Sequence, residues 1–250
     1  MLTTSLTKDQ LDRIVVVLVG ARNPLNIGAA ARAMSNFWFL QLRIVNRYQL
    51  AFREARSAVG APQVLQDAQE FQHLAEAIAD CSLVVGTTAA GSRRIEHPLH
   101  RLEAGAEFIR AHVACGSRAA LLFGSEKRGL SNDDLSYCHW LMRIPTREEH
   151  TSMNLGQAVA VCLYELIRTE AVSPAANGPG SATGVELARM EQALLEALHL
   201  SGYIKAGAES ATEERVRRLL RRMELSSEDA ETWTGMLTKM QLRRRKERRL

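Results

Sequence analysis

A segment of small residues with two polar side chains directly follows the first apolar run of the chain. It reads GARNPLNIGAAAR over residues 20–32. Asn23 is a good helix cap and Pro24 suits the first helical position, so the segment predicts a strand that passes into a helix. The small residues allow a backbone or a ligand to approach closely. Asn26 and Arg32 are therefore candidates for an anion site, the alternative being a close-packed strand–helix unit with a surface arginine.

A second segment resembles a phosphate-binding loop but lacks its cation. It reads LLFGSEKRGLS over residues 121–131. Gly124 and Gly129 have the glycine spacing of a P-loop, but Leu130 stands where that motif requires lysine. A nucleoside triphosphatase is thus unsupported, and the chain has no GxGxxG for a dinucleotide. Glu126 at the predicted strand end is a candidate to pair with an arginine or to accept a proton, or else is a solvated turn charge.

A third polar segment separates a predicted strand from a long amphipathic helix. It reads IPTREEHTSMNL over residues 144–155. Ser152 or Asn154 can cap the helix that begins at Leu155. Capping does not require so long a loop, and long loops at strand ends often bind ligands.

The elements that position these segments alternate between short apolar strands and helices. Strands are predicted at 14–19, 42–45, 83–86, 119–123 and 140–144, and helices near 24–36, 70–79, 99–114, 131–137 and from 155. This alternation predicts an α/β fold with a mainly parallel sheet. In such sheets ligands bind beyond the carboxyl ends of the strands.

The C-terminal quarter has a different organisation. Residues 171–184 contain glycine and proline but no charge, which predicts a flexible linker between a domain at 1–170 and a smaller one at 185–250. Three amphipathic helices follow the linker. Basic residues gather at Arg215–Arg222 and Arg243–Arg249, either as a solvated helix face or as an arm that contacts nucleic-acid phosphates.

Composition limits the classes of protein that the chain can represent. It has 250 residues, 46% apolar and 24% charged, with a net charge of +4. These values are ordinary for a globular protein and permit an acidic partner such as RNA. The four cysteines form no CxxC pair, so we expect core positions rather than a metal cage or disulfides. With neither a signal peptide nor a membrane segment in view, we expect a cytoplasmic protein. His97, His100, His139 and His150 receive no role.

Taken together, the three segments resemble the SPOUT superfamily of RNA methyltransferases, in its SpoU/TrmH branch. The motifs are NIGAAAR at Asn26–Arg32, FGSEKRGLS at Phe123–Ser131 and IP…SMNLGQAVAV at Ile144–Val161. The resemblance implies a deep trefoil knot in the C-terminal part of the sheet domain, S-adenosylmethionine bound in that knot, no metal, and a homodimer whose active site draws on both subunits.

The same resemblance assigns candidate residues. The cofactor pocket would be lined by Thr87, Thr88, Gly124, Ser125, Ile144, Pro145, Ser152, Met153, Asn154 and Leu155. The catalytic set would be Asn26, Arg32, Glu126, Ser152 and Asn154, facing the ribose. Because arginine stays charged at any working pH, we expect Arg32 to bind the adjacent phosphate and stabilise the developing alkoxide, with Glu126 holding it in place.

Two further stretches resemble a bacterial group of that branch, the TrmJ-type tRNA 2'-O-methyltransferases that act on nucleotide 32 of the anticodon loop. They are VGTTAAGSRR at Val85–Arg94 and the helical extension that contains GYI at Gly202–Ile204. Contacts to the tRNA backbone are expected from Arg22, Arg93, Arg94, Arg217, Arg218 and Arg221. The alternatives are methylation of ribosomal RNA or another tRNA position, a non-catalytic RNA-binding module, and a phosphate-binding hydrolase.

Overall fold

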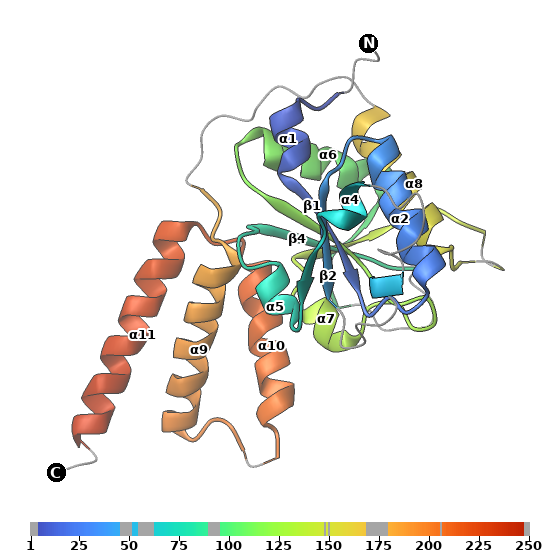
Figure 1. The fold of residues 1–250 in the computed structure, drawn as a ribbon. Coiled ribbons are helices and arrows are strands. Elements are labelled where there is room, and N and C mark those ends of the chain that lie inside the picture. Colours follow the sequence, from blue (N-terminus) through green and yellow to red (C-terminus); the bar gives the residue numbers. More distant parts are fainter. Residues whose placement is uncertain are drawn as a thin grey trace.

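A parallel seven-stranded sheet forms the centre of the computed structural model (Figure 1). The structure describes residues 5–45, 52–54, 63–89, 96–147, 149, 151–168, 180–205 and 207–247, with only the helical backbone described beyond 241. The strands are β1 (Ile14–Val19), β2 (Gln41–Val45), β3 (Gln69–Phe71), β4 (Leu83–Thr87), β5 (Leu99–Arg101), β6 (Ala119–Phe123) and β7 (Trp140–Arg143). Their order is β3-β2-β1-β6-β4-β7-β5, and every pair is parallel, which confirms the predicted fold class. The knot remains a prediction of the resemblance.

The two edge strands lie where the sequence pattern predicts helices. β3 occupies the start of the helix expected at 70–79, which is reduced to α5 (Leu74–Ala77), and β5 occupies the start of the one expected at 99–114. Each edge strand has three residues and pairs on one side only. Their side chains are largely exposed, so neither strand has the apolar run by which the interior strands are predicted.

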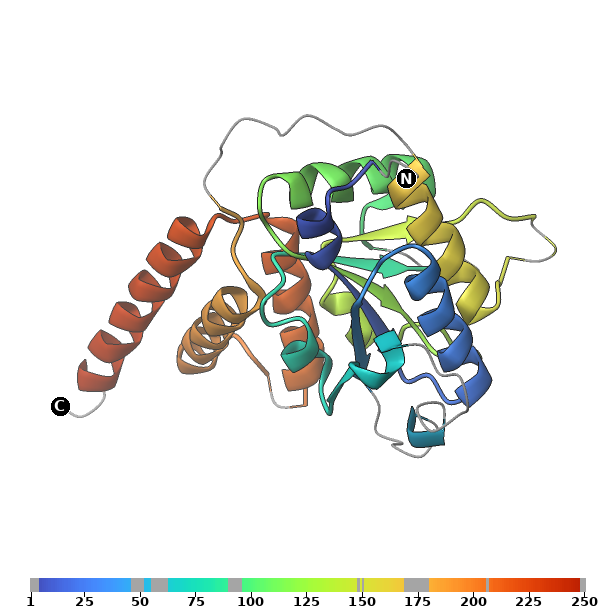
Figure 2. The same cartoon turned by 45° about the horizontal axis from the view of Figure 1, so that its top comes forward.

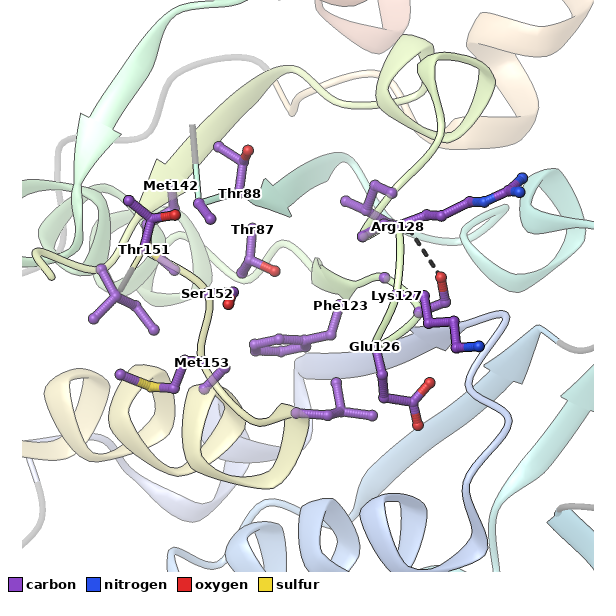
Figure 3. Close-up of a pocket in the computed structure, with 18 of the residues that line it drawn as sticks. Thr87, Thr88, Phe123, Glu126, Lys127, Arg128, Met142, Thr151, Ser152 and Met153 are labelled. Atoms are coloured by element: carbon purple, nitrogen blue, oxygen red, sulfur yellow. Dashed lines mark hydrogen bonds between the residues drawn. The ribbon is translucent and has the colours of Figure 1, made fainter. Parts of the chain in front are cut away.

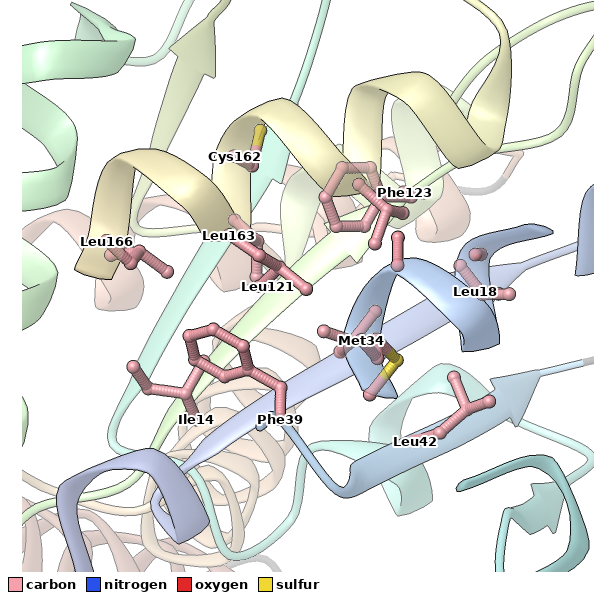
Figure 4. Packing of buried hydrophobic residues seen from close by; sticks show 14 of the residues in the cluster. Ile14, Leu18, Met34, Phe39, Leu42, Leu121, Phe123, Cys162, Leu163 and Leu166 are labelled. Carbon is pink, nitrogen blue, oxygen red and sulfur yellow. The ribbon is translucent and has the colours of Figure 1, made fainter. Parts of the chain in front are cut away.

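Helices cover both faces of the sheet. One face carries α1 (Lys8–Asp12), α2 (Pro24–Asn36), α4 (Gln63–Gln66), α6 (Leu102–Ala114) and α8 (Leu155–Arg168), and the other carries α5 and α7 (Asn132–Ser136). Alternate residues of β1 explain this layering, because Ile14 and Leu18 pack into the first layer while Val15 and Val17 pack into the second. Figure 4 shows side chains of α2 and α8 packed on β1 and β6.

Close packing of α2 against α8 depends on small residues. A Cβ added to Gly156 would lie 2.6 Å from the Cβ of Ala29. The predicted cap of α2 is confirmed, since the Asn23 side chain accepts a hydrogen bond from the backbone N–H of Leu25 at 3.0 Å. These contacts fix the two helices whose N-terminal ends carry the first and third polar segments.

Three C-terminal helices pack together beside the second face. They are α9 (Gly184–Ser201), α10 (Glu209–Arg222) and α11 (Ser227–Glu247), and they share a small apolar core. In Figures 1 and 2 α10 lies next to α7, whereas α11 extends away from the sheet. The backbone N–H groups of Gly184 and Val185 donate to the carbonyl oxygens of Cys81 and Ala79, which joins α9 to the sheet domain.

The last residues of the predicted linker pack on the sheet domain. Residues 171–179 lie outside the described residues. Beyond them, Ala182 is buried, and Thr183 caps α9 in a reciprocal pair with Glu186. Gly184 lies so close to the carbonyl oxygen of Ile78 that a Cβ would be 2.6 Å from it. The expectation of flexibility up to residue 184 is therefore wrong for its last residues, because they pack on the sheet domain.

The cysteine prediction is correct for three of the four residues. Cys81, Cys138 and Cys162 are buried, but Cys115 is exposed, because it caps the C-terminal end of α6 at the surface. No helix in the described part of the chain is long and apolar enough to cross a membrane.

Candidate functional site

Loops at the carboxyl ends of β4, β6 and β7 enclose a cavity of about 360 Å³ (Figure 3). Residues 87–89, 124–129 and 151–153 line one part of it, including the charged Glu126, Lys127 and Arg128, and apolar side chains line the rest. The apolar residues include Phe123, Leu130, Met142, Leu155 and Ala158. A cavity of this size, mostly apolar with a few polar groups, is typical of a small-molecule site.

The loop after β6 folds back on itself to form one wall. The Gly129 N–H donates to the Ser125 carbonyl oxygen at 2.8 Å, and Gly129 has a φ of +66°. A Cβ at Gly124 would collide with the backbone of Gly129 and Leu130. Because glycine fits where other residues would clash, the loop turns tightly and presents its backbone to the cavity.

Most residues predicted for a cofactor pocket do line this cavity. They are Thr87, Thr88, Gly124, Ser125, Ile144, Ser152, Met153 and Leu155. Two do not: Pro145 lines a neighbouring cavity, and Asn154 caps α8 by accepting hydrogen bonds from the N–H groups of Gly156 and Gln157. Phe123, Met142 and Ala158 were missed, because each belongs to an apolar run that predicts core.

A chain of hydrogen bonds joins the three polar segments beside the cavity. Asn154 donates through Nδ2 to Oδ1 of Asn26 at 2.9 Å, and Asn26 donates through Nδ2 to Oε1 of Glu126 at 3.1 Å. The backbone N–H groups of Asn23 and Arg22 donate to the same carboxylate at 3.2 and 3.4 Å. The direct hydrogen bond fixes the amides at 26 and 154 relative to each other, although 128 residues separate them in sequence, and Glu126 anchors Asn26.

These hydrogen bonds keep Glu126 ionised. Burial alone raises the pKa of its carboxyl, but hydrogen bonds from the backbone and from Asn26 favour the charged form more, and the pKa lies below its ordinary value. A carboxylate saturated in this way is a poor proton acceptor near neutral pH. Its geometry suits an anchor for the N-terminal turn of α2.

Glu126 does not hold Arg32, contrary to the sequence-based expectation. Its hydrogen bonds run to residues 22, 23 and 26, and Arg32 is exposed further along α2. The two helix residues are six positions apart, which at about 100° per residue places Arg32 some 120° around the helix from Asn26. Among the described residues the Arg32 side chain forms no ion pair, so its guanidinium is accessible from solvent.

Two arginines of α10, Arg217 and Arg221, pack against neighbouring elements instead of facing solvent. Arg217 forms ion pairs with Asp133 at 2.9 Å and Glu191 at 3.0 Å, and its guanidinium lies over the Tyr137 ring. Arg221 is 3% exposed, and burial lowers its pKa. The prediction that these two contact RNA is therefore wrong in this structure, because their face of α10 packs on α7.

The remaining predicted RNA contacts have mixed placements. Arg218 is partly buried and pairs with Glu96 at 2.6 Å, while Arg22 is exposed beside the Glu126 carboxylate. Arg93 and Arg94 lie outside the described residues, as does His150. Within the described residues, no group of three potential ligands gathers to hold a metal ion.

Comparison with known proteins identifies the family. The model of the SpoU rRNA Methylase family matches residues 13–164, which is more than half of the chain and contains all three polar segments. The chain belongs to this family. Its membership confirms the resemblance on which the site residues were assigned, and it confirms an enzyme that methylates RNA.

Relatives of this methylase extend the similarity to the C-terminal helices. The tRNA (cytidine/uridine-2'-O-)-methyltransferase TrmJ of Sodalis glossinidius is 32% identical over 246 residues, which is 92% of each chain. A TrmJ of Pseudomonas aeruginosa is 41% identical over 157 residues, 62% of this chain and 61% of that protein. The solved structure of TrmJ from Z. mobilis superposes with a TM-score of 0.78 at 31% identity and covers 90% of this chain and 98% of that one.

Proposed function

We propose that this methylase transfers a methyl group from S-adenosylmethionine to a ribose 2'-hydroxyl of tRNA, at nucleotide 32 of the anticodon loop. The observation that carries the proposal is the hydrogen-bonded chain of Asn154, Asn26 and Glu126 beside a cavity of cofactor size. The full-length similarity to proteins named as tRNA 2'-O-methyltransferases supports the choice of tRNA and of the ribose oxygen.

The cavity fits the cofactor by its chemistry. Apolar side chains such as Phe123 and Met142 suit the adenine and the methionine methylenes, and hydroxyls such as Thr87 and Ser152 suit the ribose and amino-acid groups. The backbone of residues 124–129 offers N–H and carbonyl groups to the same space. When bound, S-adenosylmethionine supplies an electrophilic methyl group together with its own leaving group.

The residues around the cavity then have separate roles. Glu126 fixes Asn26, and the Asn26–Asn154 pair with Ser152 orients the ribose hydroxyl toward the cavity. Arg32 binds the neighbouring phosphate and stabilises negative charge on the hydroxyl oxygen as its proton passes to solvent water. Arginine is not the proton acceptor in this proposal, since its pKa keeps it charged.

A second copy of the chain completes the site in our proposal. Several large apolar side chains on or beside α2 and α8 are exposed, namely Leu25 (80%), Trp38 (47%), Val161 (37%) and Tyr164 (51%). Exposed apolar groups gathered on neighbouring elements are typical of a surface that another protein covers. Covering this face would bring partner residues close to the accessible Arg32.

The test combines cofactor binding with two RNA substrates. Calorimetry with S-adenosylmethionine, followed by methyl transfer to tRNA and separately to ribosomal RNA, should give cofactor binding and label in tRNA alone. Label in ribosomal RNA alone would refute the substrate. Cofactor binding without transfer to either RNA would favour a non-catalytic RNA-binding module.

A further inference from the structure

Two arginines stand directly opposite each other at one edge of the sheet. In the parallel pairing of β5 with β7, Arg101 is the register partner of Arg143. Both are the last residues of their strands. Two like charges on neighbouring strands repel each other, so an anion bound between them would be favoured by both. The carboxyl ends of parallel strands are also where ligands of such sheets bind.

The pair lines its own cavity, which we call the arginine pocket. It has a volume of about 270 Å³ and is lined by Leu99, His100, Arg101, Arg143, Pro145 and Thr146. None of these lining residues is acidic. Thr146 also lines the cofactor cavity, so the two cavities are neighbours. Two cationic side chains therefore lie next to the proposed active site.

The protein does little to neutralise these cations. The Nε of Arg143 is buried without a hydrogen-bond partner, and no ion pair of Arg143 is present among the described residues. Arg101 pairs with Glu103 at 3.3 Å, but both side chains are at least half exposed, and such surface pairs contribute little. The guanidinium of buried Arg43, by contrast, donates to both carboxylate oxygens of Asp80 at 2.6 and 2.9 Å.

We propose that the arginine pocket binds a backbone phosphate of the RNA substrate, at a nucleotide next to the one that is methylated. This inference rests on the proposed function and adds a substrate contact that the catalytic residues do not supply. Two guanidinium groups with no carboxylate in the lining match the geometry and charge of a phosphodiester. A phosphate held here positions the RNA without contacting the reacting ribose.

The first test replaces one cation of the pocket and leaves its aliphatic length. Arg143→Met should raise the KM for tRNA about tenfold or more and leave kcat nearly unchanged. The salt dependence of RNA binding should lose about one unit of slope, as expected for one lost phosphate contact. Arg143→Lys should recover part of the loss. Arg168→Met is the matched control, because Arg168 is exposed on α8, pairs with Glu165 and does not line the pocket.

A second variant and a binding readout guard against a folding defect. Arg101→Met alters the other cation, and its effect on tRNA affinity should match that of Arg143→Met, with the affinity for S-adenosylmethionine within about twofold of wild type. Unchanged tRNA affinity and salt slope in both variants would overturn the proposal. Loss of cofactor affinity in both would assign the arginines to the cofactor cavity instead.

Two more measurements separate the possible sources of phosphate. Inorganic phosphate at millimolar concentration should weaken tRNA binding to wild type but not to Arg143→Met if the pocket holds a backbone phosphate. Phosphate binding in calorimetry without any effect of either variant on tRNA would show a site for the free ion and overturn the RNA contact. RNA affinity is measured by fluorescence anisotropy without cofactor, so the test of the pocket does not depend on methyl transfer. If the wild-type protein binds tRNA but does not methylate it, the proposed function is refuted, while the comparison of tRNA affinities still tests the pocket.

Discussion

The amide of Asn154 donates a hydrogen bond to the amide oxygen of Asn26 at 2.9 Å, across 128 residues of sequence. Asn154 caps α8 through its own Oδ1, and Asn26 lies in the first turn of α2. One hydrogen bond therefore ties together the N-terminal ends of two helices whose bodies are packed through Gly156 and Ala29. The relative position of the two amides is thus fixed before any substrate binds.

Asn26 is the middle residue of the hydrogen-bonded series Asn154–Asn26–Glu126, and removing its amide should reduce turnover more than cofactor binding. Asn26→Ala leaves Glu126 and Asn154 without their shared partner, so we expect kcat to fall about 10- to 100-fold. Because Asn26 does not line the cavity, the affinity for S-adenosylmethionine should stay within about twofold. Asn36→Ala, at the exposed C-terminal end of α2, is the control and should behave as wild type. Equal effects of the two substitutions would contradict the role of Asn26.

Arg32 should be needed for transfer but not for cofactor binding. Arg32→Ala removes an exposed cation that contacts neither the cavity nor Glu126, so cofactor affinity in calorimetry should be unchanged while most turnover is lost. Arg32→Lys should retain part of the activity, since the charge remains. Unchanged turnover in Arg32→Ala would remove this residue from the mechanism.

Arg217 should be important for stability rather than for RNA affinity. Arg217→Met breaks ion pairs to Asp133 and Glu191 and the contact with Tyr137, at a side chain that is 12% exposed. We expect a loss of about 2–4 kcal/mol, seen as a lower melting temperature. Arg215→Met, on the exposed face of the same helix, should leave the melting temperature almost unchanged. A large loss of tRNA affinity without loss of stability would restore the RNA-binding interpretation.

The packing of α10 on α7 also affects how a truncation of the C-terminal helices is interpreted. If the helical extension binds tRNA, deleting residues 185–250 should weaken tRNA binding and spare cofactor binding. In the structure α10 packs on α7, whose first residue, Asn132, lies two positions after Leu130, which lines the cavity. Truncation also removes Arg217 from the Tyr137 ring, so point substitutions test the role of the extension more cleanly.

Acid should destabilise the fold through His139. Its ring is buried, its Nδ1 accepts the backbone N–H of Val84 at 3.0 Å, and burial lowers its pKa to about 3. Between about pH 6.5 and 3 the unfolded chain binds a proton at this residue and the folded chain does not. Stability should therefore fall by about 1.4 kcal/mol per pH unit as the pH drops through this range.

Denaturant titrations at several pH values measure this dependence. His139→Gln should flatten the slope over that range, whereas His73→Gln, on an exposed residue, should leave it unchanged. An unaltered slope in His139→Gln would assign the acid sensitivity to other groups.

The sequence predicts the interior of the sheet well because its strands are continuous apolar runs. Ile14–Val19 and Ala119–Phe123 are buried throughout, and their bounds agree with the prediction. The edge strands were missed because pairing, rather than side-chain pattern, defines them. The site segments were found because their polar residues interrupt otherwise apolar runs at strand ends.

Long-range contacts account for what the sequence could not show. The arginine count of α10 does not reveal that Arg217 and Arg221 face α7, since that depends on how two separate segments pack. Glu126 pairs with Asn26 instead of Arg32 because Asn26 is on the side of α2 that faces the loop after β6. This could be seen only once the positions of α2 and β6 relative to each other were known. The opposition of Arg101 and Arg143 needs the strand register.

The most direct test of the account maps the methyl group that the wild-type protein transfers. Purified protein is incubated with labelled S-adenosylmethionine and unmodified tRNA, and the labelled nucleotide is located by nuclease digestion and by its resistance to alkaline cleavage. We expect a single 2'-O-methylated ribose at nucleotide 32, absent when Arg32→Ala replaces the wild type. Label on a base, or label only when ribosomal RNA is supplied, would contradict it.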